Sequence, residues 1–288
     1  MKILFALIRL LPHKAALALG RLIGRILRLV LWKKTDRCES RCVKSLGLGI
    51  TLSREIIKYS FMNLGMSVVE FIRFPKMKKD VKKFMDFDEH SIKNLRDALS
   101  RGKGVILMTN HSANWELAAM RAISEGFELH AVYTPQKNEG GINDEITRIR
   151  TQVTGMKVIE SEGAGLREIF KTLRNNGIVV IMQDLDARKD GVITNFLGLP
   201  ASTHDGIIKL YNKFKSPIVP AKCVRDFKNP EHHRVFIPEI LSDRKNFGED
   251  LKVSLEICNE FIEDCIKENP GLWLWLMDRW EYTLGKKI

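Results

Sequence analysis

The fold is decided by one stretch, Gly104-Val105-Ile106-Leu107-Met108-Thr109-Asn110-His111-Ser112-Ala113-Asn114-Trp115-Glu116-Leu117. It opens as a short apolar run, typical of a buried strand, and becomes a helical pattern through Leu117. Its polar residues lie where the strand gives way to the helix. Ligands bind at that edge of open α/β sheets, so the stretch indicates both the fold class and the place of a site.

Two residues of this stretch, His111 and Glu116, form a candidate acid–base pair. Residues five apart in one helix are rotated by about 140° and do not face each other. We therefore expect His111 in the turn before the helix, with Ser112 or Asn110 as N-cap. His111 would take a proton while Glu116 bonds its other ring nitrogen, and N–H groups at the helix start would receive negative charge. A histidine that only caps the helix is the structural alternative.

Helices and strands alternate from residue 84 onward. Apolar runs predict strands, and spacings of three and four predict helices. This alternation predicts an α/β domain with a mixed, mainly parallel sheet flanked by helices. We expect an edge strand at 233–237. The other expected strands are 104–109, 129–133, 157–159, 177–182, 192–196 and 218–224, and the expected helices are 91–101, 143–152, 165–174, 203–215 and 250–268.

The first 34 residues are apolar but carry basic residues at Arg9, Lys14, Arg21, Arg25 and Arg28. No charge-free run approaches the ~18 residues of a spanning helix, and no signal-peptide cleavage site follows. Such a helix is typical of the membrane interface, with apolar residues in the acyl region and arginines at phosphates. We expect residues 1–34 to form a membrane-associated helix before a domain at 35–288. A packed amphipathic helix and a tilted span with snorkelling arginines are the alternatives.

Helical spacing continues between this segment and the first predicted strand. We expect helix over 35–73 with a break near 47–49, and Pro75 to end it. Glu70 falls on the buried face of that helix, and we assign it a structural role. Residues 76–83 are basic and predict an exposed patch.

The composition limits the partners of this 288-residue chain, which carries a formal net charge of +12. This charge favours an anionic partner: nucleic acid, an anionic membrane or an acidic protein. The basic clusters lack the interleaved aromatic residues that stack on single-stranded nucleic acid, so we expect no nucleic-acid partner. Five scattered cysteines favour a reducing compartment. We find no metal, nucleotide or cofactor motif and no Gly-x-Ser-x-Gly elbow.

The segment from Asn110 to Glu116 resembles the His-x-x-x-x-(Asp/Glu) motif of glycerolipid-type acyltransferases. With its Asn-His and Trp-Glu pairs, it is most similar to the bacterial lipid A biosynthesis late acyltransferases. Further segments resemble that family in the same order along nearly the whole chain. They are Pro135 with Lys137-Asn138, Arg150 with Gly155, Asp184-Leu185-Asp186-Ala187, Phe196 to Thr203, Pro217 to Pro220, and Trp273-Leu274-Trp275 with Arg279-Trp280.

The resemblance implies transfer of a fatty acyl group from an acyl carrier protein to a hydroxyl of a lipid A precursor, an anionic glycolipid, at the cytoplasmic face of the bacterial inner membrane. It implies His111 as general base oriented by Glu116. It implies substrate binding by four further residues, Arg150, Asp184, Asn110 and Asn114. Leu185, where the family usually has Gln, and Met277-Asp278, where it has His and a basic residue, depart from the pattern.

Several of these positions have a second interpretation. Arg150 suits phosphate or carboxylate binding, or a surface ion pair. Asp184 could orient a side chain or a sugar hydroxyl, or cap a turn. Trp273, Trp275 and Trp280 could lie at a bilayer interface or in the core. The alternative functions are acylation of another phospholipid or glycolipid, and a non-catalytic basic protein that binds membranes.

Overall fold

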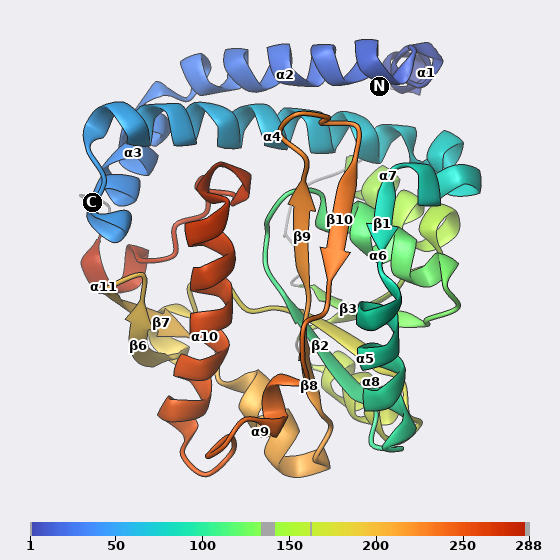
Figure 1. The fold of residues 1–288 in the computed structure, drawn as a ribbon, viewed down its shortest axis with the longest axis vertical. Helices are drawn as coiled ribbons and strands as arrows, with labels where there is room; N and C mark the ends of the chain where they lie inside the picture. The colour runs from blue at the N-terminus through green and yellow to red at the C-terminus, as the bar shows by residue number, and fades with distance from the viewer. Residues whose placement is uncertain (1, 134–141, 162, 286–288) are drawn as a thin grey trace.

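The computed structural model describes residues 2–133, 142–161 and 163–285 (Figure 1). Four helices precede the sheet: α1 (Lys2–Leu10), α2 (His13–Val30), α3 (Trp32–Leu46) and α4 (Ile50–Met77). Figure 1 places α2 and α4 side by side along one end of the molecule, blue at the top, and α2 packs along α4. The boundary expected between residues 34 and 35 falls inside α3.

The helices that follow α4 are η1 (Lys78–Lys83), α5 (Glu89–Ser100), α6 (Trp115–Ser124), α7 (Ile142–Arg148), η2 (Ile149–Thr154), α8 (Ala164–Arg174), η3 (Arg188–Asp190), α9 (Gly206–Phe214), η4 (Leu241–Asp243), α10 (Leu251–Glu268), η5 (Pro270–Leu272) and α11 (Glu281–Leu284).

A five-stranded sheet forms the centre of the molecule, in the order β4-β3-β5-β2-β8. Every neighbouring pair in it is parallel. Parallel strands need crossover helices, which cover both faces, and the predicted α/β fold is confirmed. The strands are β2 (Val105–Thr109), β3 (Leu129–Tyr133), β4 (Lys157–Glu160), β5 (Ile178–Met182) and β8 (Ile218–Pro220).

Strand β2 is buried on both sides, as its continuous apolar run predicts. Ile106 and Met108 face a core that includes side chains of α8, α9 and α10. Val105 and Leu107 face a second core shared with α5 and α6. Since successive side chains alternate across a strand, this one strand joins the two cores and fixes where its carboxyl end, and hence His111, lies.

A second sheet has the order β1-β10-β9, with strands β1 (Met85–Phe87), β9 (Lys222–Arg225) and β10 (His233–Phe236). The predicted edge strand at 233–237 is wrong in this respect, because β10 lies between the other two. Strand β1 is not among the predicted strands, because three residues are too few for an alternating pattern to reveal a strand. The predicted strand 218–224 divides at Ala221, where the chain leaves the main sheet for the second one.

Three predicted helix boundaries also differ. Pro75 does not end its helix, since α4 continues to Met77; proline removes one hydrogen bond, and buried Phe74 and Met77 hold that last turn in the core. The helix expected from residue 203 begins at Gly206, because Leu199–Thr203 is strand β7, paired with β6 (Val192–Phe196). The single helix expected over residues 1–34 is divided among α1, α2 and the first residues of α3, with Pro12 as the N-cap of α2.

Glycines allow α2 to lie unusually close to α4. A Cβ added to Gly65 would lie 2.1 Å from the carbonyl oxygen of Gly20, and one added to Gly24 would lie 2.2 Å from that of Phe61. Any larger side chain therefore clashes with backbone, which cannot yield as a flexible side chain does. The sequence places these three glycines where the two helix backbones meet.

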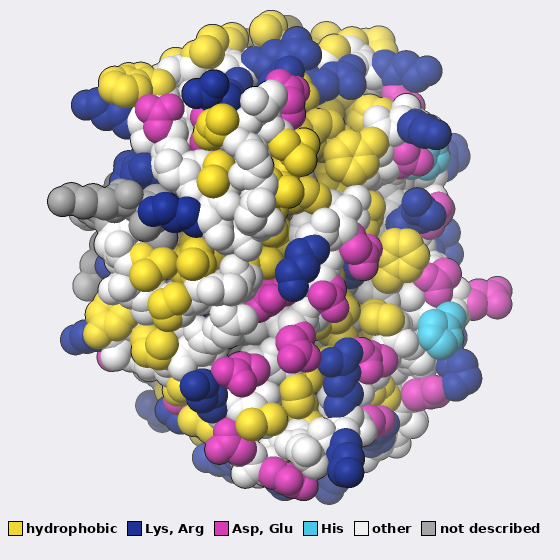
Figure 2. All heavy atoms as spheres, turned by 60° about the vertical axis from the view of Figure 1, so that its left-hand side comes forward, with side chains coloured by type: hydrophobic (Ala, Val, Ile, Leu, Met, Phe, Trp, Pro, Cys, Tyr) yellow, Lys and Arg dark blue, Asp and Glu magenta, His cyan; other side chains and the backbone are white. Residues whose placement is uncertain are grey.

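The outer face of the N-terminal helices is apolar and basic. Figure 2 shows hydrophobic and Lys or Arg side chains gathered at the top of the molecule, where Figure 1 places α2. In the described residues no helix has the length and apolarity that crossing a membrane requires. The exposed large apolar residues of this face are Ile3, Leu4, Leu7, Leu10, Leu22, Ile23, Ile26, Leu29, Val30 and Trp32.

Gly65→Val is expected to loosen α2 from α4. Overpacking of this kind costs about 1–3 kcal/mol, so the melting temperature should fall and trypsin should cleave after Arg21 and Arg25 faster than in the unmodified protein. Gly206→Val, at the start of α9 with no atom within 4 Å of the added Cβ, is the matched control. Equal cleavage rates in the two variants would contradict the close packing.

Candidate active site

The loop Asn110–Asn114 joins β2 to α6 and carries the predicted catalytic histidine. Ala113 adopts a positive φ of 53°, which non-glycine residues rarely adopt. Its carbonyl accepts hydrogen bonds from Ser67 Oγ at 2.9 Å and Asn63 Nδ2 at 3.2 Å, which stabilise the bend. The N-cap is Asn114, whose Oδ1 accepts the N–H of Leu117 at 3.0 Å. The expectation of Ser112 or Asn110 as cap is therefore wrong, because the bend delays the helix by two residues.

His111 is oriented by Asp184, which follows strand β5. Its Nδ1 lies 2.9 Å from Asp184 Oδ1, and its backbone N–H donates to Oδ2 at 2.8 Å. An ionised carboxylate only accepts hydrogen bonds, so Nδ1 carries the proton and Nε2 is left as the base. The side chain of His111 is 18% exposed and that of Asp184 is fully buried. This is the geometry of an imidazole positioned for general-base catalysis.

Glu116 does not hold the ring of His111. Its Oε1 instead accepts the Nε–H of Arg150 at 2.9 Å, with a second bond from the same guanidinium. Glu116 lies in the first turn of α6, and Arg150 reaches it from η2. The prediction that Glu116 bonds the second ring nitrogen is wrong, because Asp184 occupies that position. The ion-pair alternative for Arg150 is confirmed, although its partner lies within the motif itself.

The electrostatics of Asp184 favour its charged form. Burial alone would raise the pKa of Asp184, but the charge of His111 and hydrogen bonds from His111 and Trp273 lower it below its ordinary value. The indole N–H of Trp273 donates to Oδ2 at 2.9 Å. A buried carboxylate with these donors stays ionised at neutral pH and can stabilise an imidazolium opposite it.

A buried ion cluster holds the far side of the loop. Glu70 of α4 and Arg225 of β9 are fully buried and form a two-pronged pair, with Oε1 to Nη1 at 3.0 Å and Oε2 to Nη2 at 2.7 Å. Asn114 Nδ2 donates to Glu70 Oε2 at 2.8 Å, and His233 Nε2 lies 3.1 Å from Oε1. Burial raises the pKa of Glu70, but Arg225 and His233 outweigh it and lower that pKa strongly. The structural role expected for Glu70 extends to Asn114, the N-cap of α6, which Glu70 holds in place.

Asn110 is also buried. It directly follows β2, and its Nδ2 has no partner among the described residues. Its carbonyl accepts the N–H of Ser112 at 2.9 Å, which closes the turn around His111. Both asparagines therefore help to shape the loop, and a substrate contact by either one stays a prediction. The segment with Pro135 and Lys137-Asn138 lies outside the described residues.

An apolar pocket of about 320 Å³ opens beside this loop. Trp115 lines it, and the centre of the Trp115 ring lies 5.0 Å from the centre of the His111 ring, edge to face. Helices α1, α4, α6, α7 and η2 supply its walls, and the Glu116–Arg150 pair forms its polar side. The lining residues are Phe5, Leu64, Ser67, Val68, Phe71, Ile72, Asn114, Trp115, Glu116, Glu145, Ile146, Ile149 and Arg150.

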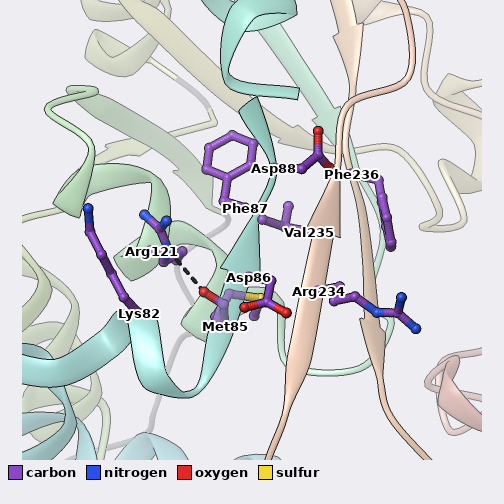
Figure 3. Close-up of a pocket in the computed structure, with 9 residues that line it drawn as sticks. All are labelled: Lys82, Met85, Asp86, Phe87, Asp88, Arg121, Arg234, Val235 and Phe236. Carbon is purple, nitrogen blue, oxygen red and sulfur yellow. Dashed lines mark hydrogen bonds between the residues drawn. The ribbon is translucent and has the colours of Figure 1, made fainter. Parts of the chain in front are cut away.

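A larger hollow of about 580 Å³ lies over β1 and β10 (Figure 3). Its lining mixes basic and acidic side chains above an apolar floor of Met85, Phe87 and Val235. Of its cations, Arg121 donates to the carbonyl of Met85, the bond drawn in Figure 3, and also pairs with Glu125, as does Lys82. No histidine, serine or cysteine is among the described residues that line it, so the smaller pocket beside His111 is the candidate site.

The C-terminal tryptophans are core residues. Trp273, Trp275 and Trp280 are all fully buried, which excludes the interface alternative because no side chain reaches a bilayer from there. Arg279 is buried beside them and bonds Thr203 Oγ1 at 2.6 Å; burial lowers its pKa to about 10. Sequence reasoning missed the contact of Trp273 with Asp184, and only the pairing of distant segments reveals it.

Known proteins provide two comparisons. The sequence model of the bacterial lipid A biosynthesis acyltransferase family matches residues 1–282. Two similar proteins are phosphatidylinositol mannoside acyltransferases of Mycobacterium tuberculosis. That of strain CDC 1551 / Oshkosh is 28% identical over 159 residues, 54% of this chain and 49% of the relative. That of strain H37Rv is 29% identical over 134 residues, 45% of this chain and 42% of the relative.

The matched part thus spans about half the length of these two relatives, whereas the family match runs from the first helix to the C-terminal tryptophans. Within it lie His111, Asp184 and the walls of the apolar pocket. The resemblance found in the sequence is confirmed, and the chain belongs to the bacterial lipid A biosynthesis acyltransferase family.

Proposed function

We propose that this protein transfers a fatty acyl group from a carrier-protein thioester to a hydroxyl of an anionic glycolipid. One observation carries the proposal. An imidazole held at Nδ1 by a buried carboxylate lies beside an apolar pocket whose wall includes Trp115. The pocket suits a fatty tail. The free ring nitrogen suits activation of an acceptor hydroxyl that attacks the carbonyl carbon at the head of that tail.

In the proposed reaction, Nε2 of His111 takes the proton of the acceptor hydroxyl as its oxygen attacks the thioester carbonyl. Asp184 stabilises the imidazolium that forms. The positive end of α6, at the N–H groups of Trp115 and Glu116, stabilises the oxyanion. Collapse of the tetrahedral intermediate forms the ester and breaks the C–S bond, and the imidazolium returns its proton to the thiolate. No covalent acyl-enzyme is required.

Glu116 and Arg150 stay in the proposed site as a pair. They line the apolar pocket at its polar side, and the guanidinium is about one third exposed. We assign them to binding the polar part of a substrate, next to the reacting carbonyl, where a guanidinium suits a phosphate. Asn110 and Asn114 shape the loop, and Asp184 acts through the imidazole.

The proposed acceptor is a lipid A precursor, following the family to which the chain belongs. A second candidate is a mannosylated phosphatidylinositol, favoured by the similarity to the two mycobacterial phosphatidylinositol mannoside acyltransferases. Both are anionic glycolipids, which suits a chain of net charge +12. An acidic carrier protein as donor suits the same charge. No cofactor and no nucleic acid enters this proposal.

We also propose that the protein works at the cytoplasmic face of the bacterial inner membrane, bound through α1 and α2. The support is their outer face, where exposed leucines and isoleucines lie among arginines. Apolar side chains of this kind enter the acyl boundary while arginines contact lipid phosphates. Phe5 of α1 also lines the apolar pocket, so the bound face would lie next to the entry for lipid.

The direct test supplies the purified protein with acyl-carrier thioesters and, in parallel, a tetra-acylated lipid A precursor or a phosphatidylinositol mannoside. Mass spectrometry should detect one added acyl chain on one of the two acceptors. Activity with the mannoside alone would select the second candidate. If neither acceptor gains an acyl chain, the proposed function is overturned.

Val68→Trp should shift the chain-length preference. Val68 lies in the wall of the apolar pocket and is about half exposed, so a larger side chain takes space from a fatty tail. Loss of room for about two methylenes costs ~1.6 kcal/mol, or roughly tenfold in rate, for a hexadecanoyl donor. Transfer from a hexanoyl donor should stay nearly unchanged. Val253→Trp, on α10 away from the pocket and similarly exposed, is the control, and equal losses for both donors would contradict the pocket assignment.

A further inference from the structure

The C-terminal segment Leu272–Leu274 is built into the catalytic loop. The N–H of Ala113 donates to the carbonyl of Leu272 at 2.9 Å, and that of Leu274 donates to the carbonyl of His111 at 3.0 Å. Ser112 and Trp273 form an antiparallel bridge between them. The loop that bends around His111 is thus paired, like a short strand, with residues that lie about 160 positions later in the chain.

The side chain of Trp273 makes a second connection, to the carboxylate. Its Nε1–H donates to Asp184 Oδ2 at 2.9 Å. The same carboxylate accepts the His111 backbone N–H on Oδ2 and faces the His111 ring on Oδ1. Asp184 and Trp273 are both fully buried, so water cannot replace the indole as a donor. The distance and burial make this one of the stronger hydrogen bonds of the site, since its acceptor is charged.

Two neighbouring tryptophans provide an internal comparison. Trp280 lies 6.1 Å from Trp273, ring centre to ring centre, and Trp275 lies 4.7 Å from it. Both are as buried as Trp273. The Nε1 of Trp275 donates to the carbonyl of Pro270, while that of Trp280 has no partner among the described residues. Apolar packing alone would require only the rings, so the N–H of Trp273 has a distinct role.

We infer that Trp273 is a positioning residue that fixes Asp184 by its indole N–H and thereby sets the orientation and basicity of His111. The inference rests on the proposed function for its meaning in catalysis. The indole orients Oδ1 toward the ring and draws negative charge toward Oδ2. Without it, the carboxylate would interact more strongly with the imidazolium and be held less firmly in position. The expected consequence is a slower enzyme that needs a higher pH to become active.

Trp273→Phe should lower kcat about tenfold, the loss expected for one hydrogen bond to a charged group, with KM within about twofold. The acid limb of its pH–rate profile should move to higher pH by roughly 0.5–1 unit. Trp280→Phe, which removes an unpartnered N–H and a similar volume from the same cluster, should keep the pH profile of the unmodified protein. Both variants are compared by circular dichroism and melting temperature.

A spectroscopic readout makes the test independent of activity. The Nδ1 proton of His111 should give a low-field proton resonance that is absent in His111→Ala. In Trp273→Phe this resonance should move further downfield, and in Trp280→Phe it should not move. If Trp273→Phe does not fold, benzothienylalanine at position 273 replaces only the N–H by sulfur and decides the question.

An unshifted resonance and an unchanged acid limb in the Trp273 variant would overturn the inference, even if the enzyme transfers acyl groups. A shifted resonance in a protein that acylates no lipid would keep the Trp273–Asp184–His111 connection and overturn the proposed function instead. Equal shifts in the Trp273 and Trp280 variants would assign the effect to packing and also overturn the inference.

Discussion

His111→Ala is expected to lower the rate of acyl transfer by about 10²–10⁴-fold, the contribution of a positioned general base. The physical reason is that the acceptor hydroxyl then has no group to take its proton, while Asp184 and the apolar pocket remain. KM for the thioester should change little, because His111 does not line the pocket proposed to hold the tail. Initial rates at saturating donor and acceptor measure the effect.

His232→Ala is the matched control, because His232 is exposed and lies outside the site. It should keep the unmodified rate. The His111 ring is only partly buried, so the circular dichroism spectrum and melting temperature of His111→Ala should remain near those of the unmodified protein. A folded His111→Ala protein that retained full activity would rule out general-base catalysis by this residue.

Asp184→Asn should cost about 10³–10⁴-fold in kcat, the scale seen when an orienting aspartate becomes an amide. The amide nitrogen can donate to Nδ1 and so favours the wrong tautomer, with the proton on Nε2. Asn also carries no charge to stabilise the imidazolium. The loss should therefore appear in kcat and persist across the neutral pH range.

Glu116→Gln distinguishes the role of Glu116 from that of Asp184. Glu116 pairs with Arg150 at the polar side of the pocket, whereas Asp184 bonds the His111 ring. Loss of the Glu116 charge leaves the partly exposed Arg150 guanidinium without its ion-pair partner. Partly exposed salt bridges contribute only ~1 kcal/mol or less. The effect should be roughly tenfold or less and appear mainly in KM. An equal fall in kcat for Glu116→Gln and Asp184→Asn would contradict the assignment of Asp184 as the orienting group.

Much of the site was accessible from the sequence because parallel strands share an edge. The runs at 104–109 and 177–182 each predicted a buried strand followed by polar residues, and His111 and Asp184 are the second residue after each run. Their nearness follows once β2 and β5 are neighbours. The sequence also indicated that an aspartate there could orient a side chain. The prediction of Glu116 as the partner is wrong, because spacing along one segment does not record which side chains meet across two neighbouring strands.

Local patterns alone determined the α/β class, the apolar and basic character of the first helices, and the strand-to-helix corner at Asn110–Asn114. Each of these depends on side chains a few residues apart, whose periodicity records which face is buried. The N-cap within that corner was not accessible in the same way, because the bend at Ala113 is held by Asn63 and Ser67 of a different helix.

Tertiary structure alone decided which groups complete the site. The pairing of Asp184 with a histidine 73 residues earlier, the Trp273 indole behind it, and the Glu70–Arg225 pair beneath Asn114 all join segments far apart in the chain. A buried charge requires a partner in whichever element packs against it. That element is set by the order of the strands and the course of the C-terminal segment, which no local pattern encodes.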